Sequence, residues 1–139
     1  MSIGVIDMDF KDIKREMLKK DSWAVVGVTE DTDRYGYKIW EILKEHGYRS
    51  YGVNPKYEEI KGEKIYRKLS DIDEKIDVVD MVVSPRIGSA ILDEASELGI
   101  EYIFFQPGSY DDELVEKAET LGFKYLINDC VYATLKEKE

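Results

Sequence analysis

The residues with the clearest chemical potential follow short apolar runs and could bind a phosphate. Gly27 and Thr29 follow one such run, and Lys56 follows another. A glycine lets an anion approach the backbone N–H groups of a loop, and a lysine neutralises the charge of the anion. The single histidine, His46, has no serine, cysteine or acid placed to work with it. The pattern therefore indicates a binding site, and no catalytic residues are expected.

The end of the second apolar run distinguishes between classes of nucleotide. An NAD site needs an acidic side chain there to bind the ribose hydroxyls, whereas this chain has Asn54, Pro55 and Lys56. A lysine suits a ribose phosphate, which NADP carries. The first loop, however, lacks the glycine spacing of nicotinamide dehydrogenases, because Thr29 and Thr32 stand where glycines would be needed. An NADP-dependent oxidoreductase stays open as an alternative on these grounds.

Alternating strands and helices would position these residues at one edge of a sheet. The expected strands are 24–26, 49–53, 77–83, 102–105 and 125–127, with a short edge strand at 62–66, and the expected helices begin near residues 37, 84, 109 and 129. This alternation predicts an α/β fold: a three-layer, Rossmann-like, doubly wound and mostly parallel sheet with helices on both faces. Ligands of such sheets bind at the carboxyl ends of the strands, where the strand order reverses.

Cap residues and apolar spacing predict where the helices start and which faces they bury. Ser84 and Ser109 are expected to cap two helices, and Asp9 is expected to cap a leading helix over 9–20. Asp80 lies inside an otherwise apolar strand, so it requires a buried partner. The buried stripe of the helix after Ser84 is expected to consist of Ile87, Ile91, Ala95 and Leu98.

Length and composition limit the class of protein. The 139 residues are expected to form one domain, 1–139, with the leading helix of segment 1–21 packed on it; a mobile or partner-binding arm is the alternative. The net charge of −10 argues against a nucleic-acid partner. No apolar run approaches the ~20 residues that span a membrane and no secretory signal is visible, so a cytoplasmic location without a membrane partner is predicted. Few amides among many charged residues hint at a thermophilic source.

Several segments, taken in order, form a recognisable pattern. They are 24–29, 34–37, 47–49, 53–64 and 77–80, and the most specific piece is Asn54-Pro55-Lys56-Tyr57 with the trailing Gly62. The pattern resembles the small stand-alone coenzyme A-binding proteins that are related to the N-terminal domain of the succinyl-CoA ligase alpha subunit. This resemblance implies a Rossmann-like domain that binds coenzyme A (CoA) through its ADP and pantetheine parts. It implies no established reaction.

The resemblance and the strand-end geometry together predict a CoA or acyl-CoA site. The diphosphate would lie on the loop after the first strand, the ribose phosphate at Lys56, the adenine against 82–87 and the pantetheine near 106–108. The acidic residues of the first loop are expected to be solvated, so no metal site is predicted. The expected cofactor-binding residues are Gly27, Val28, Thr29, Arg34, Tyr35, Gly36, Tyr37, Lys38, Asn54, Pro55, Lys56, Val83, Ser84, Pro85, Arg86, Ile87, Gln106 and Gly108.

The expected role is that of a non-catalytic CoA carrier, sensor or accessory protein. The alternatives are an NADP-dependent oxidoreductase and a regulatory subunit of an acyl-CoA ligase whose partner supplies the catalytic groups. The expected macromolecular partner is a second copy in a homodimer or an acyl-CoA enzyme. Cys130, the sole cysteine, is either packed and inert or close enough to the CoA thiol for a redox role.

Overall fold

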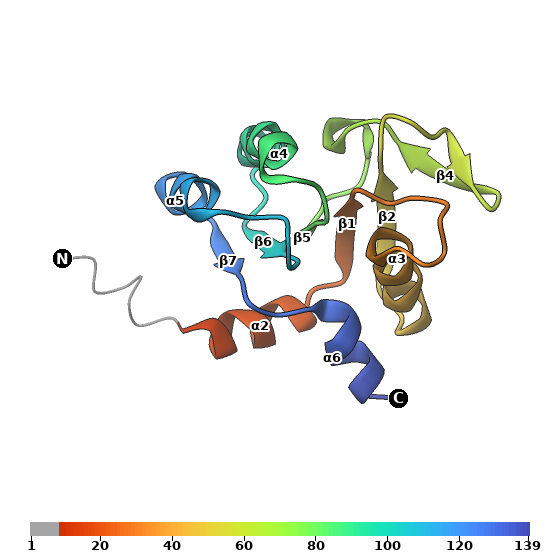
Figure 1. Cartoon of the computed structure of the whole chain (residues 1–139), viewed down its shortest axis with the longest axis horizontal. Helices are drawn as coiled ribbons and strands as arrows, with labels where there is room; N and C mark the ends of the chain where they lie inside the picture. Colours follow the sequence, from red (N-terminus) through yellow and green to blue (C-terminus); the bar gives the residue numbers. More distant parts are fainter. Residues whose placement is uncertain (1–8) are drawn as a thin grey trace.

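The strands form one sheet with a mostly parallel arrangement. The computed structural model describes residues 9–139. The seven strands have the order β3-β4-β2-β1-β5-β6-β7 (Figure 1), and among them β3 alone pairs antiparallel, with β4. The strands are β1 (Ser22–Val26), β2 (Arg49–Val53), β3 (Glu59–Ile60), β4 (Glu63–Tyr66), β5 (Val78–Met81), β6 (Tyr102–Phe105) and β7 (Lys124–Leu126).

The strand order reverses beside β1. From β1 the chain passes to β2 and on to β4, and it returns to β5 on the other side of β1. Val25 in the middle of β1 is thus paired with Gly52 on one side and with Asp80 on the other. The chain leaves the ends of β1 and β5 in opposite directions, which opens the crevice in which a doubly wound sheet binds its ligand.

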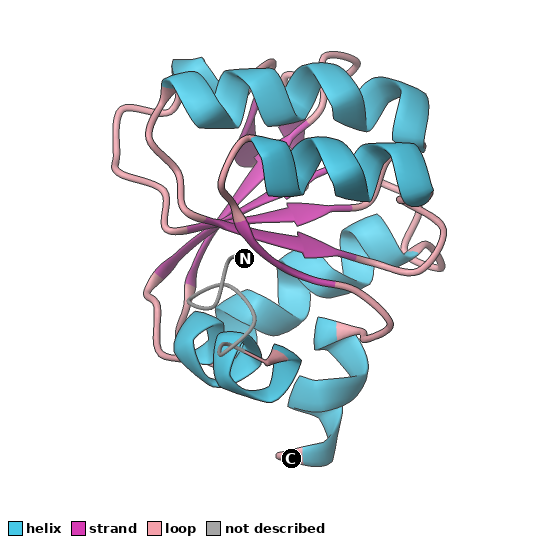
Figure 2. Ribbon diagram, turned by 90° about the vertical axis from the view of Figure 1, so that its left-hand side faces the viewer, coloured by secondary structure: helices cyan, strands magenta, loops and turns pink. Residues whose placement is uncertain are grey.

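Helices cover both faces of the sheet, as Figure 2 shows. On one face lie α2 (Phe10–Leu18), α3 (Tyr35–Glu45) and α6 (Val131–Glu137), and on the other lie α4 (Pro85–Glu97) and α5 (Asp112–Thr120). A 3-10 turn, η1 (Leu69–Asp71), joins the second group. The predicted α/β, Rossmann-like, doubly wound sheet is therefore confirmed.

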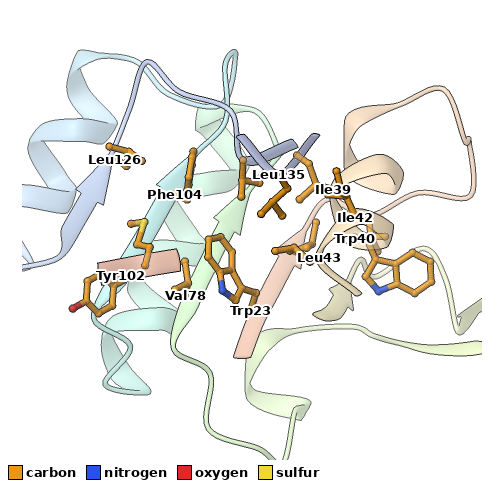
Figure 3. Packing of buried hydrophobic residues seen from close by; sticks show 14 of the residues in the cluster. Trp23, Ile39, Trp40, Ile42, Leu43, Val78, Tyr102, Phe104, Leu126 and Leu135 are labelled. Carbon is orange, nitrogen blue, oxygen red and sulfur yellow. The ribbon is translucent and has the colours of Figure 1, made fainter. Parts of the chain in front are cut away.

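The face under α3 carries large aromatic side chains. Trp23 of β1 and Phe104 of β6 pack in the same cluster as Leu43 of α3 and Leu135 of α6 (Figure 3). All five residues of β1 are buried, which explains its unbroken apolar run. Each fully buried leucine or phenylalanine contributes about 1.5–3 kcal/mol by leaving water, so this layer holds α3 on β1.

The leading helix is α2, and residues 1–8 of the expected segment 1–21 lie outside the described residues. The Asp9 carboxylate accepts a hydrogen bond from Asp12 N at 3.0 Å and caps the helix as expected. Met17 is fully buried in the cluster that covers the first face. Like every other helix in residues 9–139, α2 is not long and apolar enough to cross a membrane.

Ser109 does not cap the helix that follows it, so that prediction was wrong. α5 begins after Asp111, whose carboxylate accepts a hydrogen bond from Leu114 N at 2.8 Å. The Ser109 hydroxyl instead donates to Gln106 O at 2.7 Å inside a tight turn. Because the turn uses the serine, the aspartate two residues later becomes the cap. Ser84 does occupy the N-cap of α4, although its hydroxyl makes no capping bond.

Several other helices and strands also differ in bounds or place from the sequence-based positions. α3 starts at Tyr35 rather than near 37, and α6 starts at Val131 rather than near 129. Gly36 allows the early start of α3, because without a side chain the first turn can lie against the preceding loop. The expected edge strand, β4, lies one position inside the sheet, because residues 59–60 fold back on it as β3.

α4 buries only part of the stripe that its apolar spacing predicts: Ala95 is buried and Ile91 is half-buried, but the two ends of the stripe are not. Leu92 and Ala95 are fully buried, whereas Ile87 and Leu98 are 52% and 46% exposed. The buried face includes Gly88, where a Cβ would lie 3.2 Å from a side chain of α5. A glycine does not contribute to an apolar pattern. The stripe predicted from the apolar residues therefore lies about one residue away from the face that is buried.

Candidate functional site

The loop after β1 packs directly on the start of α3. A Cβ on Gly36 would lie 2.2 Å from Gly27 O, which is far inside van der Waals contact. Gly27 has φ +110°, and a Cβ there would lie 2.9 Å from Val82 O, just past the end of β5. The fold therefore requires glycine at both predicted positions, and it brings them together at the crevice beside β1.

Several backbone N–H groups at this loop lack acceptors. Within residues 9–139, the N–H groups of Val28 and Thr29 donate to no other backbone or side-chain group. α3 begins after Arg34, whose side chain makes no capping bond, and the N–H groups of its first turn, from Tyr35 to Tyr37, also have no acceptor in the described part of the chain. Free N–H groups at the positive end of a helix favour an anion, and this arrangement suits a phosphate.

The polar side chains of the same loop bind one another. The Thr29 hydroxyl lies 3.2 Å from the Tyr57 hydroxyl and accepts a hydrogen bond from Asp31 N at 3.3 Å. Arg34 is exposed, and its Nε lies 3.7 Å from a carboxylate oxygen of Asp31. In the part of the chain that the structure describes, no cluster of acidic, cysteine and histidine side chains could hold a metal ion. Tyr57 is absent from the predicted site residues, although it ends the Asn-Pro-Lys-Tyr motif that the sequence singles out.

Lys38 is held against aromatic rings. Its Nζ lies 5.3 Å from the ring centroid of Tyr35 and 5.8 Å from that of Tyr132 in α6. The two rings pack edge to face with centroids 5.9 Å apart. Cation–π contacts of this kind favour one position of the ammonium group. They also place α6 beside the start of α3, so that Cys130, the half-buried N-cap residue of α6, lies on the same face of the sheet as α3.

Asn54 joins the loops that follow β1 and β2. Its Nδ2 donates to Val28 O at 2.8 Å, and its Oδ1 accepts from Lys56 N at 2.9 Å. The side chain thereby links the two loops and shapes the turn at Pro55. The structure thus brings together the predicted residues of the first two strand ends. Both polar atoms of the Asn54 side chain are used in the hydrogen bonds that hold the two loops together.

Two exposed cations stand at the ends of β2 and β4. Lys56 forms no ion pair within residues 9–139, and neither does Arg67, which directly follows β4. Arg67 places Nη2 3.5 Å from Pro55 O, so its guanidinium lies against the turn that carries Lys56. The sequence reasoning missed Arg67 because it treated β4 as a remote edge strand. The parallel pairing of Val53 with Tyr66 instead puts the two carboxyl ends side by side.

The predicted residues after β5 separate into two groups. Val83 lies beside the first loop, since a Cβ on Gly27 would lie 3.0 Å from Val83 Cγ1. Pro85 and Arg86 line a hollow of about 610 Å³ between α4 and α5, together with Lys117. Arg86 therefore faces a different part of the surface from the loop after β1, and only the start of this segment joins the crevice.

Gln106 directly follows β6, and its side chain is buried. It is 2% exposed, and its Nε2 donates to Asp80 Oδ1. The turn after it contains Gly108 at φ +88° and closes with a hydrogen bond from Ser109 N to Gln106 O at 3.0 Å. This strand end therefore presents the exposed backbone of Pro107 and Gly108 to solvent, and the amide of Gln106 points into the core.

Comparisons with known proteins match this arrangement. A family model described as a CoA binding domain matches residues 21–136. An ADP-forming acetate–CoA ligase of Methanocaldococcus jannaschii is 30% identical over 112 residues, which make up 76% of this chain and 16% of the ligase. The alpha subunit of ADP-forming acetate–CoA ligase II of Pyrococcus furiosus is 29% identical over 119 residues, covering 78% of this chain and 26% of that subunit. The chain thus spans about a sixth to a quarter of the length of these relatives.

Solved structures with the same fold include one chain of similar length and one much longer synthetase. A hypothetical protein from Pyrococcus horikoshii OT3 is 32% identical with a TM-score of 0.85, and the likeness covers 93% of this chain and 91% of that one. A dinucleotide-forming acetyl-coenzyme A synthetase of Ca. Korarchaeum cryptofilum, in complex with phosphate and ADP, is 25% identical with a TM-score of 0.71. That likeness covers 81% of this chain and 26% of the synthetase.

Proposed function

Because the chain belongs to the CoA binding domain family, whose model matches residues 21–136, we propose that it binds coenzyme A or an acyl-CoA at the carboxyl ends of its parallel strands. The ADP-forming acetate–CoA ligases among its relatives support this choice of ligand. The reversal of strand order beside β1 supports this location, since doubly wound sheets bind nucleotides there. We further propose that the chain acts as one CoA-binding domain, to which α2 belongs.

In this proposal the diphosphate lies on the loop after β1. The free N–H groups of Val28, Thr29 and the first turn of α3 support this placement, because they are donors without acceptors in residues 9–139. Gly27 and Gly36 keep side chains away from the same loop. Arg34 and Lys38 supply positive charge at its far end.

The ribose phosphate lies at the ends of β2 and β4. The observation that carries the proposal is the pair of exposed cations Lys56, in the turn after β2, and Arg67, which lies against that turn; neither has an acidic partner among the described residues. An exposed carboxylate at this position would bind the free ribose diol of NAD, whereas two cations favour a phosphate. CoA carries this phosphate on the ribose that also bears the diphosphate.

The other strand ends bind the two ends of the ligand. The adenine lies on the side of the residues after β5, and the pantetheine lies along the turn after β6, where Gly108 exposes its backbone. Of the expected adenine-side residues Val83, Ser84, Pro85, Arg86 and Ile87, the proposal keeps the start of the segment at Val83, because Pro85 and Arg86 line the separate hollow between α4 and α5.

The role that fits these features is a non-catalytic CoA carrier, sensor or accessory protein. The accessory role is supported by the similarity of this chain to parts of ADP-forming acetate–CoA ligases. In this role a separate acyl-CoA enzyme supplies the reacting groups. A homodimer and a cytoplasmic location stay predictions. Light scattering with and without CoA tests whether the protein is a homodimer.

Isothermal titration calorimetry with four ligands tests the proposal. CoA should bind most tightly, dephospho-CoA about tenfold more weakly because it lacks the ribose phosphate, and NAD more weakly still. Equal affinities for CoA and dephospho-CoA would remove the role of Lys56 and Arg67. Tighter binding of NADP than of CoA would favour the oxidoreductase alternative. Native mass spectrometry of the purified protein would identify any acyl group that travels with it.

A further inference from the structure

A buried acid occupies the centre of the sheet, next to the crevice. Asp80 lies in β5, is 0% exposed, and is paired in register with Val25 of β1 and Phe104 of β6. One of its oxygens, Oδ1, accepts a hydrogen bond from Gln106 Nε2. The other oxygen, Oδ2, is buried without a partner, and so is Gln106 Oε1. The pair therefore contains two buried acceptors that lack a donor within residues 9–139.

A single proton would give both of these atoms a hydrogen-bond partner. Placed on Asp80 Oδ2, it makes that atom a donor, and Gln106 Oε1 is the acceptor that the paired amide offers. An ionised carboxylate in this position would have one hydrogen bond and no cation to offset its loss of water, which is the costly state for a buried acid. Burial raises the pKa of the Asp80 carboxyl to about 8, and the hydrogen bond from Gln106 lowers it in part.

The titratable groups around this face of the sheet are engaged elsewhere. Glu16 of α2 accepts from the Tyr102 hydroxyl and lies 3.4 Å from Lys124 Nζ. The Tyr48 hydroxyl donates to a backbone carbonyl, and Lys38 lies over aromatic rings. Within residues 9–139, Gln106 is the only residue that forms a hydrogen bond or ion pair with the side chain of Asp80. Lys14 of α2 is paired with Asp129, and Lys44 of α3 is paired with Glu41 and Glu63. Other titratable groups near this face include Lys20, Tyr37, Tyr132 and Cys130.

The partner of Asp80 begins the turn at the end of β6. Gln106 N donates to Met81 O at 3.1 Å, and Gln106 O accepts from both the backbone N–H and the hydroxyl of Ser109. Pro107 and Gly108, the latter at φ +88°, occupy the middle of the turn, as in a type II turn. Every polar group of Gln106 except Oε1 is thus bound, and its side chain is held through Asp80.

We propose that Asp80 is a neutral carboxylic acid at physiological pH, joined to Gln106 by two hydrogen bonds, and that this pair positions the turn at the end of β6. The second part rests on the proposed function, because the turn matters to a ligand only if the pantetheine of CoA lies along it. Asp80 is then a positioning residue, which acts on the ligand through Gln106.

The protonation state is tested by stability against pH in wild type and Asp80→Asn. Asparagine has an NH2 group that donates and an amide oxygen that accepts, so it can form the same two hydrogen bonds without a proton to lose. The pKa of Asp80 is raised from 3.8 when unfolded to about 8 when folded, so between these values the folded state holds one more proton. The folding equilibrium constant of wild type, relative to Asp80→Asn, should therefore fall by up to about tenfold per pH unit as the pH rises, and level off above about 8.

If the ratio of the folding equilibrium constants of wild type and Asp80→Asn does not change between about pH 5 and pH 8, Asp80 is ionised and the proposal is overturned. A second measurement needs no variant. With ¹³C-labelled aspartate, the carboxyl carbon of Asp80 should keep the shift of the protonated acid at neutral pH, where the exposed aspartates are ionised. A carboxyl that titrates with those exposed aspartates would contradict it.

The positioning role is tested with CoA and with adenosine 3′,5′-bisphosphate, which lacks the pantetheine. Asp80→Leu removes the partner of Gln106, so it should weaken CoA binding by about tenfold and leave the fragment little changed. Asp80→Asn should restore CoA binding relative to Asp80→Leu. Equal losses for CoA and the fragment, or no rescue by asparagine, would overturn this role. If wild type binds neither ligand, the proposed function fails, while the carboxyl titration still decides the state of Asp80.

Discussion

The loops after β1 and β2 leave neighbouring strands of one sheet, but they are built from different parts of the chain. The first is packed backbone against backbone, with Gly36 pressed on Gly27 and no room for a Cβ. The second carries the exposed Lys56, and the exposed Arg67, which follows β4, lies against its turn at Pro55. Asn54 connects the two through its bond to Val28 O.

This difference separates stability from binding. A change in the first loop moves α3 off the sheet, so it should alter folding and ligand binding together. A change in the second loop removes charge from a surface, so it should alter binding and leave folding unaffected. The comparison therefore predicts an ordered series of effects, from the most packed position to the most exposed one.

Gly36→Ala should have the largest effect, because its Cβ would meet Gly27 O at 2.2 Å. We expect a loss of about 3 kcal/mol or more in the free energy of unfolding, since backbone on both sides must move. Urea unfolding followed by circular dichroism measures it. Gly47→Ala is the matched control: its φ is +89° but nothing lies within 4 Å of its Cβ, so only about 1–2 kcal/mol of backbone strain is expected. Equal losses for the two variants would break the comparison.

Asn54→Ala should have an intermediate effect on both properties. It removes the hydrogen bond to Val28 O and the one from Lys56 N, and it leaves the first loop without its link to the second. We expect about 1–2 kcal/mol lower stability and weaker CoA binding, because each such bond contributes about 1 kcal/mol net. Paired unfolding and calorimetry experiments measure the two effects. Weaker binding with unchanged stability would place Asn54 with the second loop alone.

Lys56→Ala and Arg67→Ala should change binding only. Each should weaken CoA by about fivefold to tenfold, and neither should alter the affinity for dephospho-CoA, which lacks the phosphate they would bind. The loss should shrink at high salt, which screens exposed charges. Lys68→Ala, an exposed lysine next to Arg67, is the control and should leave the preference for CoA over dephospho-CoA intact. If either site variant lowers the midpoint of urea unfolding markedly, the second loop is not the independent surface described above.

Cys130→Ser should have the smallest effect on affinity. The variant tests whether the ligand site beside the first loop reaches as far as Cys130. If the CoA thiol reaches this side of α3, the Cys130 thiolate attacks CoA disulfide, forms a mixed disulfide with one CoA and releases the other as its thiolate. Intact mass spectrometry should then show one reducible CoA adduct per chain, absent from Cys130→Ser. Wild type that stays unmodified under native conditions would place Cys130 outside the site.

The sequence by itself predicted most of the elements in order and indicated a phosphate-bearing ligand. Local patterns were sufficient: the run at β1 is apolar because every residue of that strand is buried, and Asn54-Pro55-Lys56 shows a strand end without the acid that NAD requires. These features depend on neighbours in the chain, so they can be read without knowing which strands are adjacent. The strand alternation likewise predicted the doubly wound sheet, which the strand order confirms.

Tertiary structure alone decided which distant residues meet. Arg67 reaches the turn of Lys56 because β4 pairs with β2, and Gly36 is essential because α3 lies on Gly27. The Asp80–Gln106 pair joins residues 26 positions apart through the pairing of β5 with β6. Such contacts follow from strand order and helix packing, which arise when the whole core is buried at once, and no local periodicity records them.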